Sequence, residues 1–81
     1  MIDPAGAIGR HVGKMIYGNE SDSAACEALV AAHPSAANVV IDEFLKYLAK
    51  YPGSEHCKET QDGIDLIRAM QARIALCNTR T

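Results

Sequence analysis

The sequence predicts an all-α protein, a small antiparallel bundle of about four helices joined by short Pro/Gly/Ser turns. Apolar residues recur at three- and four-residue spacing in several segments, which places them on one face of a helix. Proline interrupts this pattern at Pro34 and at Pro52, where helices are expected to end or begin. No alternating run of β-branched residues lies between turn dipeptides, so no strand is predicted.

The central helix is predicted over residues 35–51, with Ser35 as a hydroxyl N-cap and Tyr51-Pro52 as its end. Its apolar residues form one wide face, and Tyr47 and Tyr51 extend that face towards a second neighbour. The face consists of Val40, Ile41, Phe44, Leu45 and Leu48. We expect Phe44 and Leu48 to lie in the core.

The first helix is predicted from Asp3-Pro4 to about Tyr17, with an Asp cap, a proline in the first helical position and a stop at Gly18-Asn19. The second helix is expected to begin after Asn19 or Ser21 and to end at His33. Small apolar residues dominate it, so it should pack closely and contribute modestly to the core.

The last helix is predicted from Glu55 to about Cys77. One apolar seam runs along it, formed by Gly63, Ile67, Met70, Ile74 and Cys77. The joints at Pro34 and at Pro52-Gly53 share one pattern, in which a helix ends, proline follows and the next helix starts. Both joints are therefore predicted to be antiparallel hairpins.

Three glycines stand at helical spacing beside the apolar face of the first helix: Gly6, Gly9 and Gly13. Each glycine costs a helix interior about 1 kcal/mol relative to alanine. Close packing against another helix would explain them, either inside the fold or on a partner. With the neighbouring Arg10 and Lys14, these glycines are the candidate partner-binding residues.

Composition sets limits on the class of protein. The chain has 81 residues, and we expect residues 1–81 to form a single helical domain with a thin, alanine-rich core. Possible oligomerisation would add buried area. No segment has the length of a membrane span and no signal peptide is recognisable at the N-terminus, so a cytoplasmic protein without membrane contact is expected. A trimmed chain that is secreted or periplasmic remains an alternative.

The three cysteines are expected to be thiols in a reducing compartment. Cys57 and Cys77 are separated along one helix by about 30 Å, too far to bridge. His56 and Cys57 point about 100° apart, so they do not chelate one metal together. No metal site is predicted. Cys57 is expected in the first turn of its helix, which makes it the candidate reactive thiol.

Catalytic chemistry finds no support in the sequence. The close carboxylates, Asp42-Glu43 and Asp62/Asp65, lie on polar helix sides with no cleft implied. No phosphate-binding loop follows a strand, and no Ser/His/Asp order is recognisable. We therefore expect no enzyme, no catalytic residue and no cofactor.

Residues 47–54, followed by an amphipathic helix, resemble the joint between tetratricopeptide units. With Cys26 before it and Cys77 after it, the same region also resembles the helical immunity proteins that neutralise type VI secretion effectors. The second resemblance implies a protein that binds and blocks another protein.

These features favour a small non-enzymatic protein-binding module, of the stoichiometric inhibitor, immunity or anti-defence type or a small adaptor. The partner is expected to be another protein. One alternative is a nucleic-acid-binding helical protein that uses Arg10, His11 and Lys14, although the formal net charge of −2 does not favour it. Another alternative is a small metal or redox protein that uses the cysteines.

Overall fold

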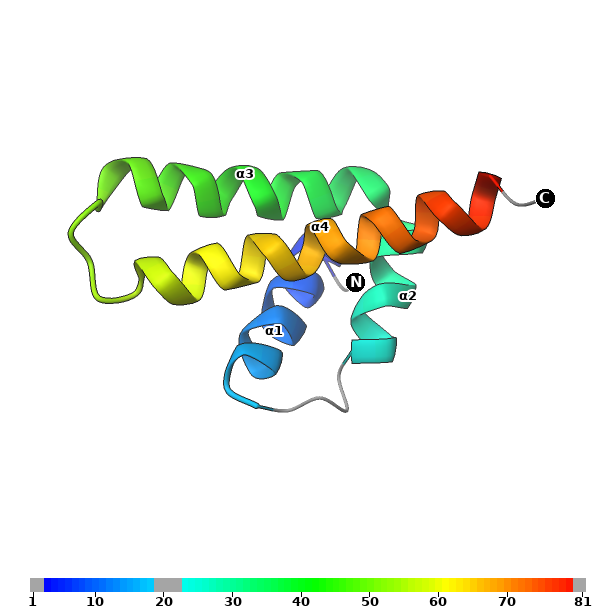
Figure 1. Cartoon of the computed structure of the whole chain (residues 1–81), viewed down its shortest axis with the longest axis horizontal. Coiled ribbons are helices and arrows are strands. Elements are labelled where there is room, and N and C mark those ends of the chain that lie inside the picture. The colour runs from blue at the N-terminus through cyan, green and yellow to red at the C-terminus, as the bar shows by residue number, and fades with distance from the viewer. Residues whose placement is uncertain (1–2, 19–22, 80–81) are drawn as a thin grey trace.

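A computed structural model of the chain describes residues 3–18 and 23–79. They form four α-helices: α1 (Pro4–Ile16), α2 (Ser23–Ala32), α3 (Pro34–Lys50) and α4 (Cys57–Thr79). The two long helices α3 and α4 lie side by side and run in opposite directions, and α1 and α2 pack against them (Figure 1). The predicted all-α bundle is confirmed, and no strand occurs within the described residues.

The local chemistry of α1 follows the prediction closely. The Asp3 side chain accepts a hydrogen bond from the Ala5 amide at 3.2 Å, and Pro4 occupies the first helical position. At the other end, the Gly18 amide donates to the Met15 carbonyl at 3.0 Å with a φ of 95°. That left-handed conformation suits glycine and ends the helix.

The joint between α2 and α3 differs from the predicted hairpin. Only His33 separates the two helices, and their axes are bent by 111°. Because a residue before proline is driven from the α region, His33 adopts φ −133° and ψ 68°. One residue is too short to reverse the chain. Pro34, not Ser35, starts α3, and its N-cap His33 makes no side-chain capping bond. The predicted start of the second helix lies outside the described residues.

The joint between α3 and α4 is the antiparallel hairpin that the sequence predicts. Tyr51 precedes Pro52 and leaves the helical region with φ −128° and ψ 61°. The chain then turns through residues 52–56, and the Ser54 amide donates to the Tyr51 carbonyl at 3.1 Å. The helix α4 begins at Cys57, two residues later than expected, and continues without a break through Gly63.

The core draws on all four helices. It comprises Ile8, Val12, Cys26, Val30, Ala37, Val40, Ile41, Ile64, Ile67 and Met70. Phe44 and Leu48, which were expected in the core, are half-buried and pack against its edge, while Leu45 is 41% exposed. The α3 face is therefore wider than the surface that its neighbours cover.

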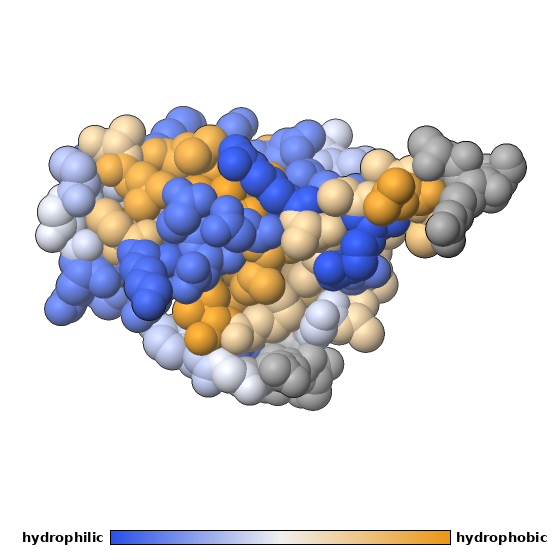
Figure 2. All heavy atoms as spheres, viewed as in Figure 1, coloured by the Kyte–Doolittle hydropathy of each residue, from blue (hydrophilic) through white to orange (hydrophobic). Residues whose placement is uncertain are grey.

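On α4 the predicted seam is correct from Gly63 to Ile74, which still packs against the core, and wrong at Cys77. Ile64, which the seam omitted, is fully buried beside Ile67. Ile74 is half-buried and Cys77 is exposed, because the last turns of α4 extend beyond the other helices (Figure 1). Apolar atoms also remain visible between α3 and α4 and below α4 towards α1 (Figure 2).

No single helix among the described residues combines the length and the apolar content of a membrane span. Only α2 and α3 taken together reach that limit, across the 111° bend between them.

Candidate protein-binding groove

The glycine residues of α1 lie beside open space. Among the residues that the structure describes, a Cβ atom built on Gly9 or on Gly13 would find no other side chain or neighbouring helix within 4 Å. At Gly6 the three nearest described atoms belong to the N-cap residue of the same helix, Asp3, at 3.4–3.8 Å. The predicted close packing of this stripe inside the fold is therefore wrong, and the other alternative, contact with a partner, stays a prediction.

The glycines instead form the floor of a groove that runs along α1. One hollow of about 380 Å³ lies between α1 and α3, and a second of about 210 Å³ continues towards the start of α4. The two share Gly9 and Phe44, so we treat them as one feature, the glycine groove. Its lining consists of Asp3, Ala5, Gly6, Gly9, Val12, Gly13, Ile16, Tyr17, Val39, Val40, Glu43, Phe44, Glu59 and Thr60.

The walls of the glycine groove are largely apolar and partly uncovered. Val39 is 50% exposed, and Phe44 is only half-buried although it is the one phenylalanine of the chain. Because an exposed apolar wall beside a floor without side chains leaves room for an incoming segment, the groove has the character of a recognition surface.

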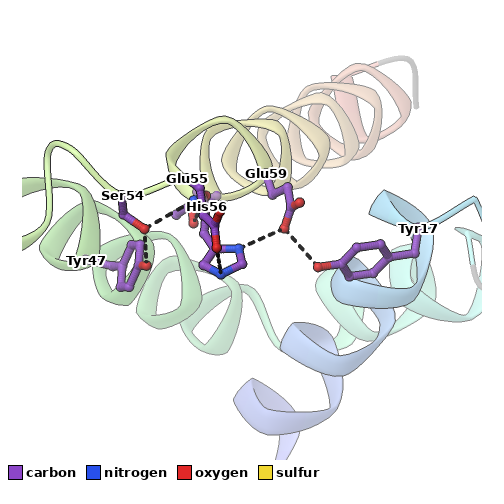
Figure 3. A network of polar contacts seen from close by, with 7 residues as sticks. Tyr17, Tyr47, Ser54, Glu55, His56 and Glu59 are labelled. Atoms are coloured by element: carbon purple, nitrogen blue, oxygen red, sulfur yellow. Dashed lines mark hydrogen bonds and ion pairs between the residues drawn. The ribbon is translucent and has the colours of Figure 1, made fainter.

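The end of the groove near α4 is polar. The Tyr17 hydroxyl donates to Oε2 of Glu59 at 2.8 Å, and Nδ1 of His56 lies 3.4 Å from the same oxygen. Figure 3 shows Tyr17 and His56 approaching Glu59 from opposite sides. Tyr17 follows the last residue of α1, His56 lies in the turn before α4, and Glu59 lies in the first turn of α4. These contacts tie α1 to α4 and hold the Glu59 carboxylate at the groove.

A second hydrogen-bonded pair, Tyr47 of α3 and Ser54 of the following turn, lies beside the polar end of the groove. The Tyr47 hydroxyl and the Ser54 Oγ are 2.8 Å apart, and Ser54 Oγ accepts from the His56 amide at 3.1 Å (Figure 3). The His56 ring contacts the carboxylates of Glu59 and Glu55, at 3.4 and 3.8 Å. These contacts position the turn between α3 and α4.

The hydrogen bond to Glu59 raises the pKa of Tyr17 above its ordinary value of 10.0, and the negative charge of Glu59 adds to the rise. Both effects favour the protonated hydroxyl over the tyrosinate. Tyr17 therefore remains a hydrogen-bond donor to Glu59 throughout the neutral pH range.

The basic residues of α1 lie on its other flank. Arg10, His11 and Lys14 line a hollow of about 330 Å³ together with Ala7 and with Leu29 of α2. The structure therefore brings together the three residues of the nucleic-acid alternative. It places Arg10 and Lys14 outside the lining of the glycine groove, so the predicted partner-binding set falls into two separate surfaces.

The cysteines are thiols at three levels of burial: Cys26 is buried, Cys57 half-buried and Cys77 exposed. Cys57 does begin α4, but its thiol donates to the Tyr51 carbonyl at 3.1 Å and approaches the Pro52 carbonyl at 3.6 Å. The Cys57 side chain is therefore half-buried and hydrogen-bonded to the backbone of the preceding turn, whereas Cys77 is exposed.

Within the described parts of the chain, no three His, Cys, Asp or Glu side chains gather closely enough to hold a metal ion. The metal alternative therefore gains no support from the geometry.

Comparison of the chain with known protein families, with curated proteins and with solved structures gives no match.

Sequence reasoning found the glycines but missed the residues opposite them. Val39 and Glu43 come from α3. Tyr17 and Glu59 are 42 positions apart in the sequence and come into contact only in the folded chain. One signal was available: Val39 is an apolar residue immediately beside the predicted face of its helix.

Proposed function

We propose that this protein is a non-enzymatic, stoichiometric protein-binding module of the inhibitor, immunity or adaptor class, and that the glycine groove is its binding surface. The open space above Gly9 and Gly13 is the observation that carries the proposal. Glycine is unfavourable within a helix, and a Cβ atom at either of these two positions would contact nothing among the described residues. A partner backbone or side chain that enters the space would explain them.

The experiment compares the wild-type chain with Gly9→Leu and with Ala75→Leu as a matched control. Leucine at Gly9 fills the groove floor, whereas Ala75 is exposed on α4 and lines neither hollow of the groove. Each chain is immobilised and used to capture proteins from cells of the source organism. Captured proteins are then purified and titrated against each chain by calorimetry.

We expect one protein to bind wild type and Ala75→Leu in a one-to-one complex, and to bind Gly9→Leu at least about tenfold more weakly, the loss that about 1.4 kcal/mol produces. A partner that binds all three chains equally would place the interface elsewhere. Chemical turnover of a captured protein or small molecule by the chain would overturn the non-enzymatic proposal.

A second candidate function rests on the basic hollow of Arg10, His11 and Lys14. These side chains converge on one space and could contact consecutive phosphates of a nucleic acid. A salt titration of oligonucleotide binding tests this directly, because each phosphate contact contributes about −0.7 to −0.9 to the slope of log K against log salt. Arg10→Gln with Lys14→Gln should remove about two contacts from that slope. Binding without salt dependence would exclude this candidate.

A further inference from the structure

The charged residues that line the glycine groove all have the same sign. Asp3 lies at one end, Glu43 on the α3 wall and Glu59 at the other end. No described Lys or Arg residue lines either hollow of the groove. Lys46 approaches Glu43 at 3.6 Å, but both side chains are well exposed, at 75% and 65%, so this pair is weak.

The hollow next to the groove extends the acidic character. It has a volume of about 420 Å³ and shares Ile16 with the groove, and its charged lining residues are Asp62 and Asp65 of α4. The basic residues of α1, in contrast, line the hollow that faces α2. The helix α1 therefore separates an acidic, apolar surface from a basic one.

The dimensions of the glycine groove suit a helix. It follows α1, whose 13 residues correspond to about 20 Å. Glycine on the floor allows a second backbone to come close, while Val39, Phe44 and Ile16 offer apolar contact along the walls. An amphipathic helix in such a groove contributes apolar anchors at three- and four-residue spacing.

We propose that the occupant of the glycine groove is an amphipathic helix of another protein, whose apolar stripe is flanked by Lys or Arg. This inference rests on the proposed function and adds the chemistry of the partner. Basic residues about three to four turns apart on that helix would reach the carboxylates at both ends of the groove, at 5.4 Å per turn. Asp3, Glu43 and Glu59 would then select a basic segment and disfavour an acidic one.

A displayed library of helical peptides tests this choice. The peptides are about 16 residues long, enough to follow α1 at 1.5 Å per residue. Leucine is constant along one stripe, and the flanking positions vary among Lys, Glu, Gln and Ala. The baits are the wild-type chain, Gly9→Leu and Glu43→Lys. Glu43 is chosen because it is exposed, whereas Asp3 caps α1 and Glu59 accepts the Tyr17 hydroxyl.

We expect wild type to enrich Lys-flanked peptides, with affinities about tenfold above those of the matched Glu-flanked peptides. Gly9→Leu should lose this enrichment, and Glu43→Lys should shift it towards Glu. Enrichment that Gly9→Leu abolishes but that shows no preference for Lys would overturn the basic partner and leave the protein-binding groove intact.

Further results would overturn the inference. No enrichment by any bait, or equal enrichment by wild type and Gly9→Leu, would mean that the groove does not accept a helix. In sedimentation of the wild-type chain, a dimer that Gly9→Leu dissociates would mean that the occupant is a second copy of this chain. Neither result depends on the capture experiment, so the proposed function is judged separately.

Discussion

A Cβ atom added to Gly63 of α4 would lie 3.0 Å from Cε2 of Phe44 on α3. The same atom would lie 3.0 Å from Cγ1 of Val12 on α1. Gly63 is therefore the residue whose missing side chain lets three helices approach one another. The glycines of α1, for which the sequence predicted this role, do not have it inside the fold.

Glycine substitutions should consequently have opposite effects at the two places. Gly9→Ala and Gly13→Ala should each stabilise the protein by up to about 1 kcal/mol, because alanine favours the helix and meets nothing. Gly63→Ala should gain nothing, and Gly63→Leu should lose about 1–3 kcal/mol or more, because Val12 is fully buried and has no room to move aside. Urea unfolding of the variants measures the differences.

Gly53→Ala is the control for a glycine outside any helix, since a Cβ there also meets nothing. If Gly63→Ala stabilised the protein as much as Gly9→Ala, the close contact with Phe44 and Val12 would be absent.

Core substitutions should distinguish Ile67 from Leu48. Ile67 is fully buried, so Ile67→Asp places a carboxylate where water does not reach, and the cooperative thermal transition should disappear. Leu48 is only half-buried, so Leu48→Asp should lower the Tm and keep a cooperative transition. Circular dichroism during heating measures both. Equal loss of folding in the two variants would show that the α3 face is buried more deeply than its exposure indicates.

The contact between Tyr17 and Glu59 predicts a pH dependence. The pKa of Tyr17 is raised in the folded protein, so the native state binds this proton more tightly than the unfolded chain. The resulting stabilisation is complete below pH 10.0, the ordinary value, and is lost as the pH rises through the native pKa. Ultraviolet titration of the tyrosines, with Tyr17→Phe for assignment, measures the shift.

Glu59→Gln should bring the titration of Tyr17 back towards its ordinary value, because the amide has no negative charge. The wild-type protein, titrated under the same conditions, is the reference. A Tyr17 titration that Glu59→Gln leaves unchanged would contradict the contact.

Thiol alkylation should follow exposure and hydrogen bonding. Cys77 is exposed and should react first, Cys57 should follow because its thiol donates to backbone carbonyls, and Cys26 should react only on unfolding. This order differs from the expectation from the sequence, in which Cys57 is the candidate reactive thiol. Peptide mapping after timed treatment with iodoacetamide gives the rates, and a Cys57 rate above that of Cys77 would restore the earlier expectation.

The sequence by itself determined the features that depend on neighbours along the chain. Asp3 and Pro4 start α1 and Gly18 ends it, through contacts within a few residues, and Pro52 ends α3 in the same way. Apolar spacing identified Ile67 and Met70 as buried because periodicity reports which residues share a face. Such local interactions need no knowledge of the rest of the fold.

Only the tertiary structure decided how those faces meet. Pro34 predicted a break but not the 111° bend, and the seam of α4 did not show that Cys77 lies beyond the bundle. The clearest case is glycine: Gly9 and Gly63 look alike in the sequence, yet one faces open space and the other touches Phe44. The spacing of glycines in the sequence shows on which helix face a side chain is missing. Whether the gap is filled depends on helices that are distant in the chain and become neighbours only when the core is packed.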